Sequence, residues 1–561
     1  MPNPSGFKKI GPALLTSLAA LLTFLALFYF RSADDNRLFK WQWVFTNENA
    51  PAFFCLLVLG ILSAHAISRV PLFERRPLVF LFLLSYAAAA IFWTEPELIM
   101  DASRYFTQAK HLEVYGIGSF LREWGKTITA WTDLPAVPFL YGLIFRFFGE
   151  NRIFIQAFTT LLFSATLVLT CLIGKTLWSE EIGFSAGMLL LGMPFLLTQV
   201  PLMLVDVPTM FFLTLSIFTF MKALDQGGVP LIALSSLALF VTVFSKYSAW
   251  IMLSVLVPIF FVWLKKDTQA TLRRSLMVLL PAGFLIGSVT VLKFDVLAEQ
   301  IRLLLSYQKP GLGRWQESFL STFLFQVHPF ITVAAAASFF VAFKKGDWKY
   351  SIISWLAVIV FVLEIERIRY VLPVFPLVAL MASYGLQKIE RRELRRVVVF
   401  VVAISSLITA VFAYLPFARR ISAENIQKAG EYLNSRGIEA AEVFTLPLKD
   451  PVANPSVSVP LLDLFTEKKI VYQYHPELFP PPKNIGTSAL RFTWEYKNPA
   501  YYSADRIQEN NLAIVVISGD AVRGLPQDVI QKIEGRRVFK RFETSSDPFR
   551  YKTIADIYSY Q

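Results

Sequence analysis

The sequence has few of the charged residues that keep a chain of its length dissolved in water. Only 17% of its 561 residues are charged, whereas 55% are hydrophobic, including 52 phenylalanines. Several apolar runs reach the roughly 20 residues that a helix needs to cross a bilayer. A soluble core has no room for so much apolar surface, so the composition indicates an integral membrane protein.

Cysteine is almost absent as well. Only Cys55 and Cys171 occur, both within apolar runs, which excludes a disulfide framework or a cysteine metal cluster. The sequence also lacks a phosphate-binding glycine loop, a Walker lysine and an HExxH motif, so nucleotide hydrolysis is not indicated. The first apolar run, Ile10–Phe30, is longer than a signal-peptide core and lacks a small-residue cleavage site, so we expect a first membrane span there.

Positive charge is in excess, with 54 Lys and Arg against 41 Asp and Glu, a formal net charge of +13. Such a balance can indicate nucleic-acid binding. In a membrane protein, however, Lys and Arg concentrate in the cytoplasmic loops. We therefore expect the lipid bilayer, and no nucleic acid, among the partners.

The apolar runs predict thirteen spans: Ile10–Phe30, Pro51–Ile67, Pro77–Thr94, Ile153–Leu172, Phe184–Leu204, Pro208–Met221, Pro230–Phe244, Ala249–Leu264, Leu276–Leu292, Phe319–Phe343, Tyr350–Leu363, Val371–Leu386 and Val397–Leu415. A further apolar segment, Ala136–Phe148, is short and contains Arg146. Four basic clusters lie at Arg69/Arg75/Arg76, Lys265/Lys266/Arg273/Arg274, Lys344/Lys345/Lys349 and Lys388/Arg391/Arg392/Arg395/Arg396. They share the cytoplasmic side only if Ala136–Phe148 does not cross, so we expect that segment to be interfacial or re-entrant.

This orientation places the N-terminus in the cytoplasm, and Asp101 and the chain after Leu415 outside. Hydrophobicity falls after residue 416. A helix at Ile426–Arg436, strand-like runs at 441–446, 469–475, 512–519 and 536–543, and a helix at Ala521–Ile533 predict a small α/β domain. The predicted fold is mainly α: a polytopic helix bundle over residues 1–416, with an outer catalytic loop at 95–135, and a soluble extracytoplasmic domain over 417–561.

Two aspartates stand out on the predicted outer side. Asp101 opens a helical run in which Tyr105, Ala109 and Leu112 share one face. Asp206 lies between two apolar runs, where an ionised side chain is costly unless it is paired or functional. Either aspartate could instead be a helix N-cap. Together they could share a base and a cation, or one could orient the other.

Cations lie on the same predicted side. Lys246 interrupts an apolar run, where it could extend to the lipid headgroups or bind a phosphate. Arg367, Arg369 and Tyr370 precede a helix, and arginine binds phosphate in a bidentate manner. The arginines could equally form surface pairs with neighbouring glutamates. The gathering of acids and cations from distant positions, against the usual inward bias of cations, favours a functional site.

Other polar residues have simpler explanations. His328 is isolated, and we expect it to pack as a neutral side chain. Glu95 and Glu97 flank a proline at a membrane exit, where we expect them to be solvated loop charges.

The order of these motifs resembles the GT-C glycosyltransferases of the protein O-mannosyltransferase and aminoarabinose transferase group. The family loop Asp-Glu-x-Arg-Tyr corresponds to Asp101–Tyr105, and Ala102 stands where the second acid often occurs. A Thr-Lys-Gly-like element corresponds to Ser245–Tyr247, and an Arg-Tyr-x-Leu-Pro-x-x-Pro element is intact at Arg369–Pro376. The remaining matches are Ala109, Gly116, Pro135, Pro138, Tyr141, Gly149, Arg152, Asp206 and Pro208. The chain has two extra helices ahead of the one that precedes Asp101.

The resemblance implies transfer of a sugar from a polyprenyl-phosphate carrier to an extracytoplasmic protein, lipid or glycan, by a single inverting displacement. Asp101 would be the general base, and Asp206 would orient the acceptor, a cation or the sugar. The other expected site residues are Lys246, Arg367, Arg369 and Tyr370 at the carrier phosphate and headgroup, and Arg104, Tyr105 and Tyr141 at the substrate. No cofactor is implied beyond a possible divalent metal ion.

Two alternatives remain at this stage. A transporter or flippase for a lipid-linked or anionic substrate would carry polar groups or broken helices near the middle of the membrane, often in two related halves. A non-catalytic family member, in which Ala102 marks lost activity, would use its external domain to bind a partner. We expect the protein in a prokaryotic plasma membrane.

Overall fold

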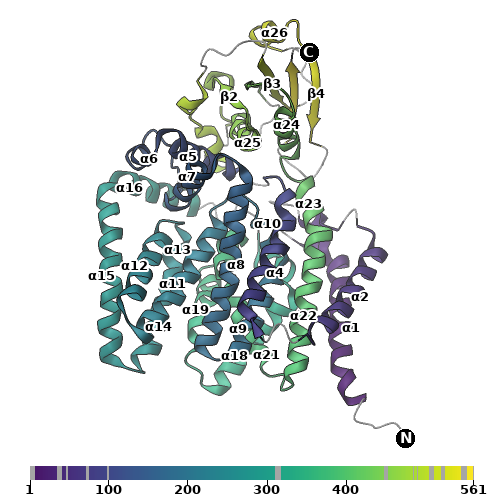
Figure 1. Ribbon diagram of the computed structural model, residues 1–561, viewed down its shortest axis with the longest axis vertical. Coiled ribbons are helices and arrows are strands. Elements are labelled where there is room, and N and C mark those ends of the chain that lie inside the picture. Colours follow the sequence, from purple (N-terminus) through teal and green to yellow (C-terminus); the bar gives the residue numbers. More distant parts are fainter. Residues whose placement is uncertain are drawn as a thin grey trace.

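The computed structural model is a bundle of long helices that carries a small α/β domain at one end (Figure 1). It describes residues 7–34, 41–45, 48–70, 75–97, 100–309, 317–447, 453–483, 485–488, 490–503, 511–519, 525–544 and 552–559. We call the end of the bundle beside the α/β domain the outer end. The predicted mainly α membrane bundle with a C-terminal α/β domain is confirmed.

Eight helical stretches in the described part of the chain are long and apolar enough to cross a membrane. They begin with α1 (Phe7–Phe30), α2 (Ala50–Ile67), α4 (Pro77–Ala90), α8 (Arg152–Leu177), α11 (Asp206–Gln226), α15 (Thr268–Leu292), α20 (Ile368–Val371, continued by α21, Phe375–Leu386) and α22 (Arg392–Thr409). Shorter apolar helices complete the bundle: α12 (Val229–Val243), α13 (Ser248–Met252), α14 (Leu256–Leu264) and α19 (Tyr350–Val362). The two extra N-terminal helices, α1 and α2, pack on α22.

Two of the predicted spans are broken, each at the residue before a proline. The predicted span Phe184–Leu204 divides into α9 (Glu180–Leu191) and α10 (Pro194–Gln199), with Met193 extended between them. The span Phe319–Phe343 divides into a π-helical turn over Ser321–Gln326 and α18 (Pro329–Lys345), with His328 extended. A residue that precedes proline is sterically pushed out of the helical region, and proline then starts the next helix.

The four basic clusters lie at the end of the bundle opposite the α/β domain. The Lys265 ammonium is 3.5 Å from the ring centre of Trp348, and Lys349 donates to the carbonyl of Leu177 at 3.0 Å. Arg396 donates to the carbonyl of Ser68 at 3.3 Å. The clusters therefore share one end, as the prediction of a common cytoplasmic side requires.

The outer end is built from short helices that follow the sequence of the predicted catalytic loop. They are α5 (Asp101–Tyr115), α6 (Ile117–Glu123), α7 (Ala136–Phe148) and, from a later loop, α16 (Phe294–Leu303) (Figure 1). Helix α7 packs on α5 so closely that a Cβ on Gly142 would lie 2.9 Å from the carbonyl oxygen of Ala109. Helix α7 has only 13 residues and lies with α5 and α6 at the outer end, in agreement with an interfacial or re-entrant segment (Figure 1).

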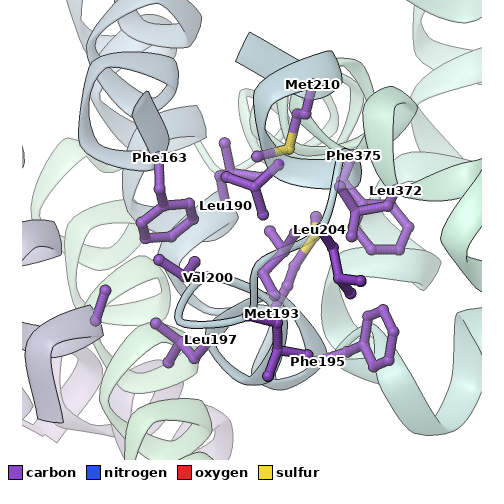
Figure 2. Packing of buried hydrophobic residues seen from close by; sticks show 14 of the residues in the cluster. Phe163, Leu190, Met193, Phe195, Leu197, Val200, Leu204, Met210, Leu372 and Phe375 are labelled. Atoms are coloured by element: carbon purple, nitrogen blue, oxygen red, sulfur yellow. The ribbon is translucent and has the colours of Figure 1, made fainter. Parts of the chain in front are cut away.

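Beneath the outer end, the loop between α10 and α11 is buried in the bundle. Figure 2 shows its Val200 and Leu204 among Phe163 of α8, Met210 of α11 and Phe375 of α21. Residues 200–205 are all buried, so this loop enters α11 at a fixed position. The position of Asp206, the first residue of α11, follows from this packing.

The α/β domain is a five-stranded sheet in the order β2-β1-β3-β5-β4. The strands are β1 (Ala440–Thr445), β2 (Lys469–Tyr472), β3 (Leu512–Ser518), β4 (Arg537–Glu543) and β5 (Ile554–Ser559). Strands β2, β1 and β3 are parallel, whereas β5 is antiparallel to both β3 and β4. The accompanying helices are α24 (Glu424–Asn434), α25 (Ser458–Leu464) and α26 (Gln527–Ile533). The four predicted strands are confirmed, and β5 and α25 were not predicted; residues 521–524 of the predicted last helix lie outside the described residues.

Close packing of α8 on α9 allows a test of the fold. A Cβ on Gly183 would lie 2.1 Å from the carbonyl oxygen of Cys171, so Gly183→Ala must push the two helices apart. We expect it to lower the thermal unfolding midpoint by several degrees in detergent, measured by intrinsic fluorescence. Gly287 of α15 has open space around it, so Gly287→Ala is the matched control and should leave the midpoint unchanged or raise it. Equal midpoints for the two variants would contradict this packing.

Candidate functional site

Arg369 of α20 lies at the centre of a buried charge cluster at the outer end. Its Nη1 is 2.6 Å from Oδ2 of Asp101, while Nε and Nη2 are 3.0 and 2.7 Å from Oδ2 of Asp206. The Arg369 side chain is 4% exposed. A single arginine thus bridges two carboxylates that are more than a hundred residues apart in the sequence.

Asp206 holds a second cation with its other oxygen. The Nζ of Lys246, in the turn between α12 and α13, lies 2.5 Å from Oδ1 of Asp206 and 3.3 Å from the carbonyl oxygen of Arg369. The side chain of Asp206 is completely buried. Two cations on one carboxylate offset the large cost of removing that charge from water.

Neither aspartate caps its helix with its side chain. The N-cap residues of α5 and α11 are Met100 and Val205, and neither helix has a side-chain cap. Asp101 and Asp206 are the first residues of these helices, where the helix dipole also favours a negative charge. The simple N-cap explanation is therefore wrong for both residues.

A third carboxylate, Asp133, joins the cluster through Arg104. The Nη2 of Arg104 is 3.1 Å from Oδ1 of Asp101 and 3.1 Å from Oδ1 of Asp133. The amide nitrogen of Gln108 donates to Oδ2 of Asp133 at 3.1 Å. Sequence reasoning missed Asp133 because an aspartate shortly before a proline resembles an ordinary turn residue. Its place in the charged loop, just ahead of the Pro135 motif, was the available signal.

The two carboxylates that share Arg104 differ in proton affinity. Burial alone would raise the pKa of Asp101, but the guanidiniums of Arg369 and Arg104 outweigh it and hold that pKa below its usual range. Burial raises the pKa of Asp133 to about 6, and the nearby charge of Asp101 acts in the same direction against the attraction of Arg104. At neutral pH both are ionised, but Asp133 accepts a proton far more readily.

Tyr370 lies between two cations at the edge of the cluster. Its ring centre is 4.6 Å from the Lys246 ammonium and 4.9 Å from the guanidinium carbon of Arg367. The Nη1 of Arg367 donates to the Tyr370 hydroxyl at 3.1 Å. Cations over an aromatic face are attracted by its quadrupole, so the ring fixes the spacing of the two charges.

The other two expected tyrosines lie deeper. Tyr141 is fully buried, and its hydroxyl donates to the carbonyl of Leu204 at 2.6 Å. It therefore supports the loop that leads into Asp206. Tyr105 is 4% exposed, with its ring centre 5.7 Å from the Arg104 guanidinium carbon.

A second set of buried ion pairs lies behind the cluster. Arg152 Nε is 2.9 Å from Oε1 of Glu97, and both Glu97 oxygens accept the N–H of Met203 at 3.2 Å. Arg152 also donates to the carbonyls of Glu95 and Pro201, at 2.8 and 3.3 Å. The expectation that Glu95 and Glu97 are solvated was wrong, because both are fully buried. They tie the chain before Asp101 to the loop before Asp206.

The C-terminal domain contacts α5 directly. The Phe492 ring centre is 4.3 Å from the guanidinium carbon of Arg104, and the Tyr501 hydroxyl donates to the carbonyl of Thr107 at 3.3 Å. Lys110 Nζ lies 2.7 Å from Asp463 of α25 and 2.8 Å from Glu150. The domain thus covers the helix that carries Asp101.

Within the ranges that the structure describes, no three His, Cys, Asp or Glu side chains gather as a metal site built from protein ligands alone requires. The carboxylates of the cluster face guanidinium and ammonium groups instead.

The charged groups are also placed at helix ends, at the starts of α5 and α11, in the turn after α12 and on α20. A transporter would instead be expected to carry such groups near the middle of its spans.

No protein-family model and no curated protein sequence matches the chain. Solved structures do match. ArnT from Cupriavidus metallidurans in the apo state aligns with a TM-score of 0.52 at 10% identity, over 85% of this chain and 97% of ArnT. The same protein bound to undecaprenyl phosphate aligns at 0.49 and 11% identity, over 86% and 98% of the two chains. The oligosaccharyltransferase AglB from Archaeoglobus fulgidus, with an inhibitory peptide and a dolichol-phosphate, aligns at 0.49 and 10%, over 80% and 70%.

The match to apo ArnT extends over most of both chains. At this identity it establishes a shared architecture, and the expected GT-C fold is confirmed. The chain therefore has the fold of the aminoarabinose transferase ArnT.

Proposed function

We propose that the protein is a membrane glycosyltransferase that moves a sugar from a polyprenyl-phosphate carrier to an acceptor at the outer face of the membrane. The observation that carries this proposal is the buried set of Asp101, Arg369, Asp206 and Lys246 at one end of a GT-C fold. A lipid-phosphate donor needs cations for its phosphate and carboxylates near the acceptor, at the level where a lipid headgroup lies.

Lys246 and Arg369 face the leaving phosphate in this proposal. In a single displacement, the acceptor oxygen or nitrogen attacks the anomeric carbon, and the bond from that carbon to the phosphate oxygen breaks with its electron pair. The phosphate then gains charge, which fixed cations stabilise without rearrangement. Lys246 uses two of its three ammonium hydrogens within the described cluster, and the third can reach a phosphate oxygen.

Asp206 keeps the cationic pair ready before the donor arrives. Its two oxygens hold Lys246 and Arg369 separately, so both cations stay in position without a bound anion. Arg104 and Asp101 complete the acceptor side, and Tyr370 with Arg367 forms the edge of the phosphate side. Tyr105 and Tyr141 act below these groups as support.

The reaction class can be tested with purified protein in nanodiscs and a radiolabelled polyprenyl-phosphate sugar, with membrane extract as the acceptor. We expect Asp101→Asn to reduce transfer at least 100-fold, because it removes the charge that orients Arg104 and Arg369. Asp225→Asn is the matched control, since Asp225 pairs with Lys266 at the far end of α11 and should retain wild-type transfer. Near wild-type transfer by Asp101→Asn would exclude Asp101 from the catalytic centre.

The phosphate site can be tested by binding alone. We expect Lys246→Met to weaken the binding of undecaprenyl phosphate about 10- to 100-fold, because it removes a charge-assisted hydrogen bond to the phosphate. The affinity is measured by titration in detergent. Loss of the ammonium also leaves Asp206 less compensated, so the Lys246→Met/Asp206→Asn double variant should recover stability without recovering binding. Unchanged affinity in Lys246→Met would contradict the assigned phosphate site. Lys266→Met, at the opposite end, is the control.

A further inference from the structure

Asp101 is a poor proton acceptor in its present surroundings. Each of its oxygens contacts a guanidinium, Oδ2 that of Arg369 at 2.6 Å and Oδ1 that of Arg104 at 3.1 Å. These two positive charges stabilise the ionised form, and the pKa of Asp101 is held below its usual range. A base is efficient when its proton affinity is close to the working pH, and Asp101 is far from that condition.

Asp133 meets that condition better. It is 7% exposed and close to only one guanidinium, while its second oxygen accepts from the neutral amide of Gln108. Burial raises its pKa to about 6. A carboxylate can accept about four hydrogen bonds, so Asp133 keeps acceptor capacity beyond its contacts with Arg104, Gln108 and the Tyr105 hydroxyl.

The backbone of Asp133 is fixed from two sides. Gln300 of α16 donates to its carbonyl at 2.9 Å, and the Asp133 N–H donates to the carbonyl of Ala130 at 2.7 Å. The Tyr247 hydroxyl, in the turn that also carries Lys246, donates a hydrogen bond to Oε1 of Gln300 at 2.5 Å. The backbone of Asp133 is therefore connected through Gln300 to the turn that carries Lys246, the proposed phosphate ligand.

Few ionisable groups surround Asp133. Asp101, Arg104 and Tyr105 face it from α5, and Tyr247 faces it from the turn after α12. Helix α16 contributes the uncharged Gln300. The Nε and Nη1 atoms of Arg104 are buried and have no hydrogen-bond partner within the described residues, so an acceptor oxygen bound beside Asp133 would satisfy them.

We propose that Asp133 is the general base of the transfer reaction, with Asp101 as a positioning residue that holds Arg104 and Arg369; this inference rests on the proposed function. The acceptor O–H or N–H gives its proton to a carboxylate oxygen of Asp133. The acceptor atom forms its bond to the anomeric carbon, and the phosphate leaves with the electron pair of the broken bond. Once Asp133 is neutral, Arg104 is attracted mainly to Asp101, and the proton is later released to solvent.

The test is the pH dependence of single-turnover transfer from a labelled undecaprenyl-phosphate sugar. In the wild type, the rate should rise tenfold per pH unit below about pH 6 and level off above it, because Asp133 must be ionised to accept a proton. Asp133→Asn should lose 100- to 10,000-fold in rate and lose this pH dependence. Asp133→Glu keeps an ionisable group, so it should retain a shifted pH dependence even if Asp133→Asn is unstable.

The Asp101→Asn variant distinguishes the contribution of Asp101 to the pH dependence from that of Asp133. It should be slow, but its residual activity should still rise through a pH near that of the wild type, because Asp133 remains. A rise near pH 6 that persists in Asp133→Asn would overturn the assignment of the base while leaving the glycosyltransferase intact. An absence of transfer by the wild type from polyprenyl-phosphate sugars would overturn the proposed function and the base together.

Discussion

The structure depends on the mutual neutralisation of charges buried at the outer end of an apolar bundle. Asp206 is fully buried and Arg369 nearly so, and either charge alone would carry a large desolvation penalty. The starts of α5 and α11, the turn after α12 and the α20 segment therefore depend on one another to neutralise their charges. The same contacts assemble the carboxylates and cations that the proposed transfer reaction requires.

Support for this cluster comes from a layer of polar contacts behind it. The Glu97–Arg152 pair fixes the chain on both sides of the cluster, and Tyr141 holds the carbonyl of Leu204 next to Asp206. The loop they hold is buried among large apolar side chains (Figure 2). Rigid support of this kind keeps reacting groups in position at little cost during the reaction.

Most of the fold and part of the candidate site could be predicted from the sequence. Apolar run lengths located the helices, and the separated acids and cations led to Asp101, Asp206, Lys246 and Arg369. The rest depends on tertiary contacts. Asp133 joins the cluster only because Arg104, which is distant from it in the sequence, contacts its carboxylate in the folded chain. Glu97 can be buried because it pairs with Arg152. Run length also gave no sign of the helix breaks, because Met193 and His328 are extended only through the prolines after them.

The contact between Lys110 and the two acids Asp463 and Glu150 has an evolutionary consequence. Lys110 lies less than two helical turns along α5 from Arg104, and both residues contact the C-terminal domain. A chimera that exchanged only the C-terminal domain would keep Glu150 but replace Asp463, the other partner of that lysine. A change in this part of the C-terminal domain therefore requires a matching change on the face of α5 that carries Lys110.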